Sequence, residues 1–191
     1  RPFPAGQQRP QVDLVFVIDT TGSMSGLIAA AKEKVWSIAT TMAQANPAPE
    51  IRVGLVAYRD HGDEYVTRTF DLTNDLGAMY AALMAFQAAG GGDGPEAVNQ
   101  ALSEAVNNLS WRRSANAYKA IFLLGDAPPH LDYENDVQYP QTLALGQRVS
   151  KSANYHRHRC PHHHPMRTGR AQQLDRLPLQ THCQLPLSGH R

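Results

Sequence analysis

The chain has 191 residues, 42% of them hydrophobic and 18% charged, which is enough for one domain with a buried core. No apolar run approaches the ~20 residues of a membrane-spanning helix, so we expect no membrane span. The net charge of +1 conceals an acidic part, residues 1–147, with 10 Lys and Arg against 16 Asp and Glu, and a basic part, residues 148–191, with 8 Lys and Arg against one acid. The acidic part disfavours nucleic-acid binding, and the basic part alone would bind nucleic acid only loosely, so no specific nucleic-acid partner is expected.

Apolar residues recur with strand and helix periods in alternation along the acidic part. The first strand is almost continuously apolar, which is typical of a strand covered on both faces of a sheet. Pro and Gly clusters separate the later elements. The predicted elements are, in chain order, a strand at 11–19, a helix at 24–42, a strand at 51–58, an edge strand at 66–72, a helix at 74–88, a helix opened by Pro95 and continuing to 109, a strand at 118–124 and a helix at 137–145.

Strands separated by helix-length crossovers predict an α/β fold, a doubly wound and mostly parallel sheet with helices on both faces. Residues 1–11 are interpreted as a flexible lead-in, and residues 12–147 as the domain. With the strands in the order 3-2-1-4, the carboxyl ends of the first and fourth strands are neighbours at the topological switch point. Asp19 and Asp126 both follow strand ends of that kind, so we expect them to lie close together.

Hydroxyl side chains follow the acid at the end of the first strand, in the segment DTTGSMSG at 19–26. Asp19, Thr21 and Ser23 stand at alternate positions, so a turn from strand to helix can project their oxygens to one side. Mg²⁺ takes about six oxygen ligands, and neutral hydroxyls supply oxygen ligands without neutralising the positive charge of the ion. Asp19, Thr21, Ser23 and Asp126 are therefore candidate ligands of a divalent cation.

This pattern resembles the metal-ion-dependent adhesion site of the von Willebrand factor A domain family, over about residues 12–147. DTTGSM resembles the first site loop, GGGDGPE the second and LLGDAPPH the third. The resemblance implies a Rossmann-like fold and a bound Mg²⁺, with Mn²⁺ or Ca²⁺ as alternatives. It further implies that Thr21 and Ser23 ligate the ion directly, and that Asp19 and Asp126 act largely through water. Asp93 stands where many members have Thr, and we expect this third acid to tighten metal binding while weakening attraction for an acidic ligand.

The resemblance implies a non-enzymatic, protein-binding module in which an Asp or Glu of the partner completes the coordination of the ion. One alternative keeps the fold as a subunit of an ATPase-driven assembly. A second is a phosphotransferase of the haloacid dehalogenase type, but that chemistry needs a second acid where this chain has Thr21. By analogy with the family, an extracytoplasmic or secreted location is expected.

Simpler roles compete with the metal hypothesis at single positions. Asp19 could cap the following helix, Asp126 could be a turn residue before two prolines, and Asp93 could be an ordinary loop acid. The acids and histidine of RDHGDE, at 59–64, are interpreted as a solvated turn rather than a second site.

The basic part at 148–191 does not continue the pattern of the domain. A doubly wound sheet should add an apolar fifth strand after the helix at 137–145, whereas the segment is polar and rich in His, Pro and Arg. Reading its codons one base out of frame would convert NYHRHR into a β-branched segment. We therefore expect the domain to be incomplete at its C-terminal end, the tail to be frameshift-derived or disordered, and the outer edge of the strand at 118–124 to be exposed.

Overall fold

A five-stranded sheet forms the middle layer of the structure, a computed structural model that describes residues 9–149 and 153–157 except for 93, 115 and 135. The strands lie in the order β3-β2-β1-β4-β5, and only β3 is antiparallel to its neighbour. This confirms the predicted order and the mostly parallel sheet. The strands are β1 (Gln11–Asp19), β2 (Glu50–Tyr58), β3 (Thr67–Thr73), β4 (Ala117–Leu124) and β5 (Ala153–Arg157).

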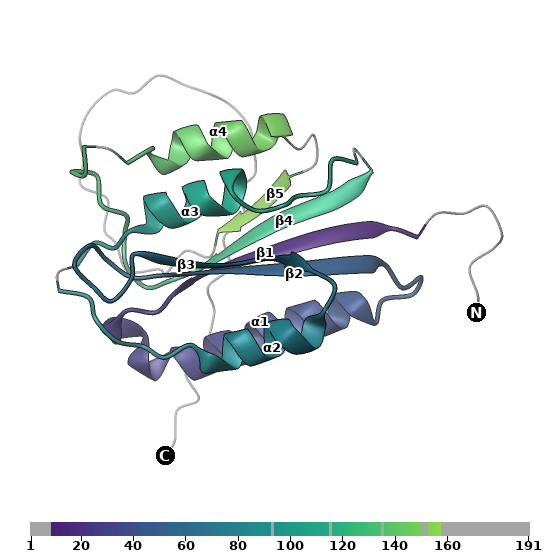
Figure 1. The fold of residues 1–191 in the computed structure, drawn as a ribbon, viewed down its shortest axis with the longest axis horizontal. Coiled ribbons are helices and arrows are strands. Elements are labelled where there is room, and N and C mark those ends of the chain that lie inside the picture. The colour runs from purple at the N-terminus through teal and green to yellow at the C-terminus, as the bar shows by residue number, and fades with distance from the viewer. Residues whose placement is uncertain (1–8, 93, 115, 135, 150–152, 158–191) are drawn as a thin grey trace, which may run out of the picture.

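Helices cover both faces of the sheet, as predicted for a doubly wound fold (Figure 1). Two helices, α1 and α2, lie on one face, and two others, α3 and α4, lie on the opposite face. In the part of the chain that the structure describes, no helix combines the length and the apolar character needed to cross a membrane. The helices are α1 (Ile28–Ala43), α2 (Leu76–Ala85), α3 (Val98–Asn107) and α4 (Tyr139–Val149).

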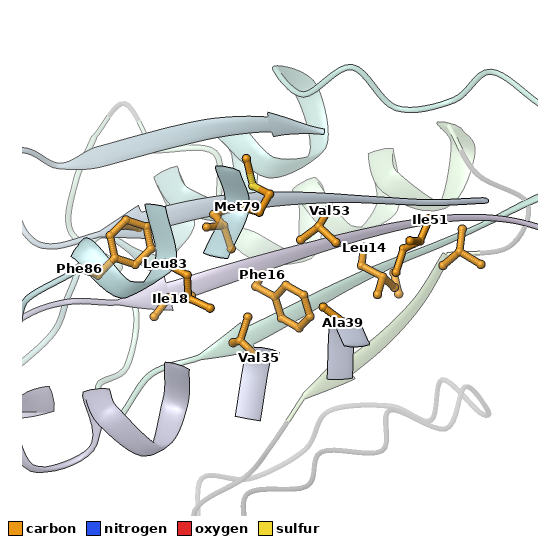
Figure 2. Close-up of a cluster of buried hydrophobic side chains, with 14 residues drawn as sticks. Leu14, Phe16, Ile18, Val35, Ala39, Ile51, Val53, Met79, Leu83 and Phe86 are labelled. Carbon is orange, nitrogen blue, oxygen red and sulfur yellow. The ribbon is translucent and has the colours of Figure 1, made fainter. Parts of the chain in front are cut away.

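The side chains of β1 alternate between two hydrophobic clusters, one on each face of the sheet. Leu14, Phe16 and Ile18 pack with β2, α1 and α2 (Figure 2). Val15 and Val17 face the other way and pack against α3. Asp13 and Asp19 are even numbers of residues away from Val15 and Val17, so all four side chains project from the same face of the strand. They therefore belong to the face that α3 covers.

The first predicted helix is divided in the structure. A 3₁₀ turn, η1 (Gly22–Gly26), comes first, and α1 begins only at Ile28. The i→i+3 bonds from Met24 N to Thr21 O and from Leu27 N to Met24 O tighten this turn, and Met24 is buried beneath it. Because the turn is tighter than an α-helix, Ser23 stays at the surface next to the end of β1. The apolar periodicity that predicted a helix from residue 24 could not reveal this.

The sheet continues one strand further than the sequence led us to expect. Ala153–Arg157 pairs in parallel with β4, so the outer edge of β4 is covered rather than exposed. Strand pairing uses backbone N–H and C=O groups, so it does not require the apolar side chains on which the expectation relied. Most of the predicted tail, residues 158–191, lies outside the described residues, and the frameshift hypothesis stays a prediction.

Candidate metal centre

The carboxyl ends of β1 and β4 bring the predicted first and third site loops together. Asp19 Oδ1 accepts hydrogen bonds from Thr21 N (2.9 Å) and Thr21 Oγ1 (2.6 Å). Thr21 Oγ1 lies 3.1 Å from Ser23 Oγ, which donates to Asp126 Oδ1 at 2.9 Å. The side-chain oxygens of four of the five predicted site residues thus lie in one row of contacts, in which the single hydroxyl protons of Thr21 and Ser23 go to Asp19 and Asp126, although Ser23 and Asp126 are 103 residues apart in the sequence.

This row of oxygens runs from the interior to the surface. Asp19 and Thr21 are fully buried, whereas Ser23 and Asp126 are exposed. The buried end is held by the strand and the tight turn, and the exposed end is open to a second molecule. A ligand bound at this centre would contact both the protein interior and solvent.

A glycine loop closes the site on the side of η1. Gly90 and Gly91 have φ values of +74° and +78°, which favour glycine. Gly22 N donates to Gly90 O at 2.9 Å, and a Cβ on Gly22 would lie only 2.8 Å from that oxygen. The Asp63 carboxylate accepts from Gly91 N and would collide with a Cβ on Gly90. Positive φ and the close approach of neighbouring atoms therefore explain glycine at positions 90 and 91 of the GGGDGPE segment.

Arg59, the residue after β2, joins the first site loop to the segment that leads from α2 to the glycine loop. Its Nε donates to Thr20 O at 3.1 Å, and its Nη2 donates to Gln87 O, also at 3.1 Å. The Tyr65 ring lies 4.4 Å from its guanidinium carbon, and the Tyr65 hydroxyl bonds Thr20 Oγ1 at 2.8 Å. Because Arg59 is buried and two of its donors bond backbone carbonyls, its role is to hold these loops in place.

The negative charge of the centre has little compensation from the protein. Burial raises the pKa of Asp19, the two hydrogen bonds from Thr21 oppose that shift, and the charge of Asp126 adds to it. Asp19 Oδ2 is buried and has no hydrogen-bond partner among the described residues. A buried carboxylate oxygen in this state is energetically costly unless a cation or a donor reaches it.

Glu96 is a further acidic residue of the centre that the sequence analysis did not select. It lies just before α3 and is 3% exposed, and its Oε2 has no hydrogen-bond partner among the described residues. Burial and the charges of Asp19 and Asp60 raise the pKa of Glu96 to about 7, against a smaller opposing effect of the Thr21 hydroxyl. The residue stands in the GGGDGPE segment three positions after Asp93, so the segment itself could have drawn attention to it.

The oxygens present fit a hard divalent cation better than a transition metal. Among the described residues, no three His, Cys, Asp or Glu side chains gather closely enough to hold a metal by themselves. Any ion at this centre would therefore depend on the hydroxyls of Thr21 and Ser23 as well as on carboxylates. Neutral and anionic oxygens together are the donors that Mg²⁺ and Ca²⁺ accept, and the uncompensated charge of Asp19 calls for a positive ion.

A family model described as "von Willebrand factor A domain" matches residues 13–145 of this chain. The chain belongs to the von Willebrand factor A domain family. The match begins within β1 and ends within α4, and it contains Asp19, Thr21, Ser23 and Asp126. The mostly parallel sheet between two helical layers is thus that of a VWA domain.

Similar sequences and structures extend this assignment. The chain is 30% identical over 119 residues to a protein named as putative ariadne-like RING finger protein R811 of Acanthamoeba polyphaga mimivirus, covering 62% of this chain and 11% of that protein. It is 28% identical over 121 residues to alpha-protein kinase vwkA of Dictyostelium discoideum, covering 62% of this chain and 19% of the kinase. The chain thus spans less than a fifth of either relative. The crystal structure of the pilus adhesin SpaC from Lactobacillus rhamnosus GG, in its open conformation, matches with a TM-score of 0.51 and 17% identity, over 78% of this chain and 24% of the adhesin, and supports the fold alone.

Two further sequence interpretations concern the loops around this centre of the VWA domain. Asp93 lies outside the described residues, so its predicted role stays a prediction. The solvated-turn interpretation of RDHGDE was wrong for its first acid. Asp60 is buried, accepts from Tyr133 Oη at 2.9 Å and lies 3.4 Å from His130 Nε2. The Tyr133 ring stacks on His61 and on His130, at 4.1 and 4.0 Å, so this turn is packed against the loop after β4.

Proposed function

We propose that this VWA domain is a protein-binding module that holds one divalent cation, Mg²⁺ by preference, at the junction of β1, η1 and β4. Asp19, Thr21, Ser23 and Asp126 would hold the ion, with Glu96 as a further candidate and Asp93 as the predicted acid of the glycine loop. The ion would neutralise the buried carboxylates and offer its remaining coordination to an oxygen of the partner. An Asp or Glu side chain of the partner is the proposed ligand.

One observation supports the proposal above all. A row of contacting oxygens from four side chains leads from the fully buried Asp19 to the exposed Asp126, and Asp19 Oδ2 has no partner among the described residues. A protein that folds with such a cluster gains stability from a cation that neutralises it. The exposed end places that cation where a partner can reach it.

We propose a binding role rather than a catalytic one. Thr21 occupies the position at which a phosphotransferase of the haloacid dehalogenase type needs a second acid, and its hydroxyl is already engaged with Asp19. The kinase and RING finger names belong to relatives of which the matched region is 19% and 11%. The activities of those whole proteins therefore provide no reason to place a catalytic group in this segment.

The first experiment titrates the chelator-treated chain with MgCl₂ and with MnCl₂ in a calorimeter. Ser23→Ala should weaken binding at least about 10-fold, because it removes one proposed ligand and the bond to Asp126. Ser25→Ala is the matched control on the same exposed turn and should bind as the unmodified chain does. Absence of uptake of both ions by the folded, unmodified chain would refute the metal site.

A second experiment tests the partner. Immobilised peptides, each made with Asp and with Asn at its centre, are probed with the chain in Mg²⁺ and in EDTA. Binding is expected only to Asp-containing peptides and only in Mg²⁺. Equal binding in EDTA, or equal binding of the Asn peptides, would contradict the proposed mode of recognition even if the metal binds.

A further inference from the structure

Tyr58, the last residue of β2, lies beside Asp19 on the sheet. The two residues are partners in the parallel register of β1 and β2, so their side chains project from the same face. Tyr58 is 0% exposed and packs in the cluster beneath α3. It is therefore a buried neighbour of Asp19, the proposed ligand at the buried end of the row of oxygens.

The Tyr58 ring extends past Asp19 toward the end of β4. Its hydroxyl lies only 2.3 Å from the point where a Cβ on Gly125 would stand, and Asp19 Oδ2 lies 3.2 Å from the same point. Glycine at position 125 thus leaves a small space that the phenolic hydroxyl and the carboxylate oxygen both border. A side chain at this position would force the hydroxyl away.

Both atoms in this space lack a hydrogen-bond partner among the described residues. A buried hydroxyl and a buried carboxylate oxygen each cost free energy when unpaired, and each is a suitable partner for the other. Burial is the largest influence on Asp19 and raises its pKa, but the Tyr58 hydroxyl is among the groups that lower it.

The phenol can act on Asp19 only as a donor. Burial, followed by the charge of Asp19, raises the pKa of Tyr58 well above its usual value, so the hydroxyl keeps its proton at neutral pH. A donated hydrogen bond favours the charged form of a carboxylate, which is the form that a cation requires. The aromatic ring accounts for the packing of Tyr58 beneath α3. Packing does not explain why the residue carries a hydroxyl.

We propose that Tyr58 is a positioning residue for the metal centre: its hydroxyl, unpaired in the metal-free protein, donates to Asp19 Oδ2 when a cation binds and holds the charged carboxylate in the orientation that the cation needs. This inference rests on the proposed metal-binding function. Tyr58 would act only through Asp19, since its hydroxyl is fully buried. The hydroxyl should therefore matter little to the metal-free fold and substantially to metal affinity.

The test compares Tyr58→Phe with the unmodified chain, measuring the thermal midpoint in EDTA and the Mg²⁺ affinity by calorimetry. In EDTA the variant should have an equal or higher midpoint, because an unpaired hydroxyl has been removed and the ring is kept. Its Mg²⁺ dissociation constant should rise about 10-fold, which corresponds to about 1.4 kcal/mol. The increase in midpoint on adding Mg²⁺ should shrink accordingly.

Tyr65→Phe provides the matched control, because the Tyr65 hydroxyl is paired with Thr20 Oγ1 and lies in the same region. That variant should lower the midpoint in EDTA, the reverse of the result expected for Tyr58→Phe. If Tyr58→Phe binds Mg²⁺ as the unmodified chain does, or loses midpoint in EDTA with unchanged affinity, the positioning role is refuted and the metal site stands. If the unmodified chain takes up no metal, the proposed function itself fails.

Discussion

The two ends of β1 each carry a fully buried aspartate on the same face of the sheet, yet in the part of the chain that the structure describes arginines neutralise only the one at the amino end. Asp13, at the amino end, accepts two bonds from the Arg52 guanidinium at 3.0 and 2.7 Å. It also accepts from the backbone N–H of Arg112 and pairs with that residue's side chain. Asp19, at the carboxyl end, accepts two bonds from Thr21, and its second oxygen has no partner among the described residues.

The difference distinguishes a compensated buried charge from an uncompensated one. At the amino end, two arginines compensate the carboxylate permanently, so the charge is part of the fold. At the carboxyl end, the neighbouring charges that act most on Asp19 and Glu96 are those of other carboxylates. A strand with one end neutralised and the other uncompensated is suited to receive an external cation at the second end.

The largest expected difference is between the variants Asp13→Asn and Asp19→Asn, which change the aspartates at the two ends of β1. Asp13→Asn should lower the free energy of unfolding by about 3 kcal/mol, because it leaves Arg52 and Arg112 without the charge that they neutralise. Asp19→Asn should leave the metal-free stability equal or slightly higher, because the raised pKa of Asp19 means that its charged form is costly at neutral pH. Urea denaturation in EDTA measures both.

Added Mg²⁺ sharpens this comparison. It should stabilise the unmodified chain and Asp13→Asn by the same increment, and it should not stabilise Asp19→Asn. Equal destabilisation by the two substitutions in EDTA would show that the protein compensates the two aspartates alike.

A second prediction concerns the loop that closes the carboxyl end. Gly90→Ala should lower the free energy of unfolding by about 2 kcal/mol, because φ is positive and the new Cβ would overlap Asp63. Gly92→Ala is the matched control two residues along, where a Cβ meets nothing within 4 Å, and it should change stability by less than about 0.5 kcal/mol. Equal midpoints for the two variants in urea would argue against the loop packing.

The smallest expected effect lies at the amino end, at Asp71 of β3. Burial would raise the pKa of Asp71, but bonds from Ser110 and from Leu72 N outweigh it and lower the pKa below its usual value. A lowered pKa in the folded state contributes stability above the unfolded pKa of about 4, and this stability is lost as pH falls through the folded value. Because the side chain is exposed, the contribution is about 0.5 kcal/mol.

Asp71→Asn should therefore be slightly less stable than the unmodified chain at pH 7. The gap should close as the pH falls from about 5 toward about 3, when the carboxylate of the unmodified chain becomes protonated. Urea unfolding midpoints measured across this pH range and at neutral pH check the prediction. A gap that widens at low pH would mean that the folded-state pKa of Asp71 is raised rather than lowered.

Most of the candidate centre could be predicted because its parts obey local or topological rules. Asp19, Thr21 and Ser23 share one turn, so their spacing alone brings their oxygens together. Asp126 lies far away in the chain but follows a parallel strand, and parallel strands end at a common edge of the sheet. The hydrogen bond between Ser23 and Asp126 is the direct consequence of these two facts.

Other residues of the centre follow no such rule. Glu96 precedes a helix, and no spacing in its segment predicted that its carboxylate would be buried next to Asp19. Tyr58 ends a strand of ordinary apolar character, and only the absence of a side chain at Gly125 lets its hydroxyl reach the space beside Asp19 Oδ2. The polar character of RDHGDE suggested solvent, whereas Asp60 finds its partner Tyr133 73 residues away.

Periodicity, crossover length and alternate spacing are local properties of the chain, and they were enough to define the α/β class, the order of the first four strands and the set of oxygens offered to a cation. Which buried charges are compensated was settled by the folded arrangement alone. Asp13 meets Arg52 and Arg112 from 39 and 99 residues away, whereas Asp19 meets Asp126 and Glu96 instead. Electrostatic energy depends on distance in space and on burial, and neither can be obtained from position in the chain.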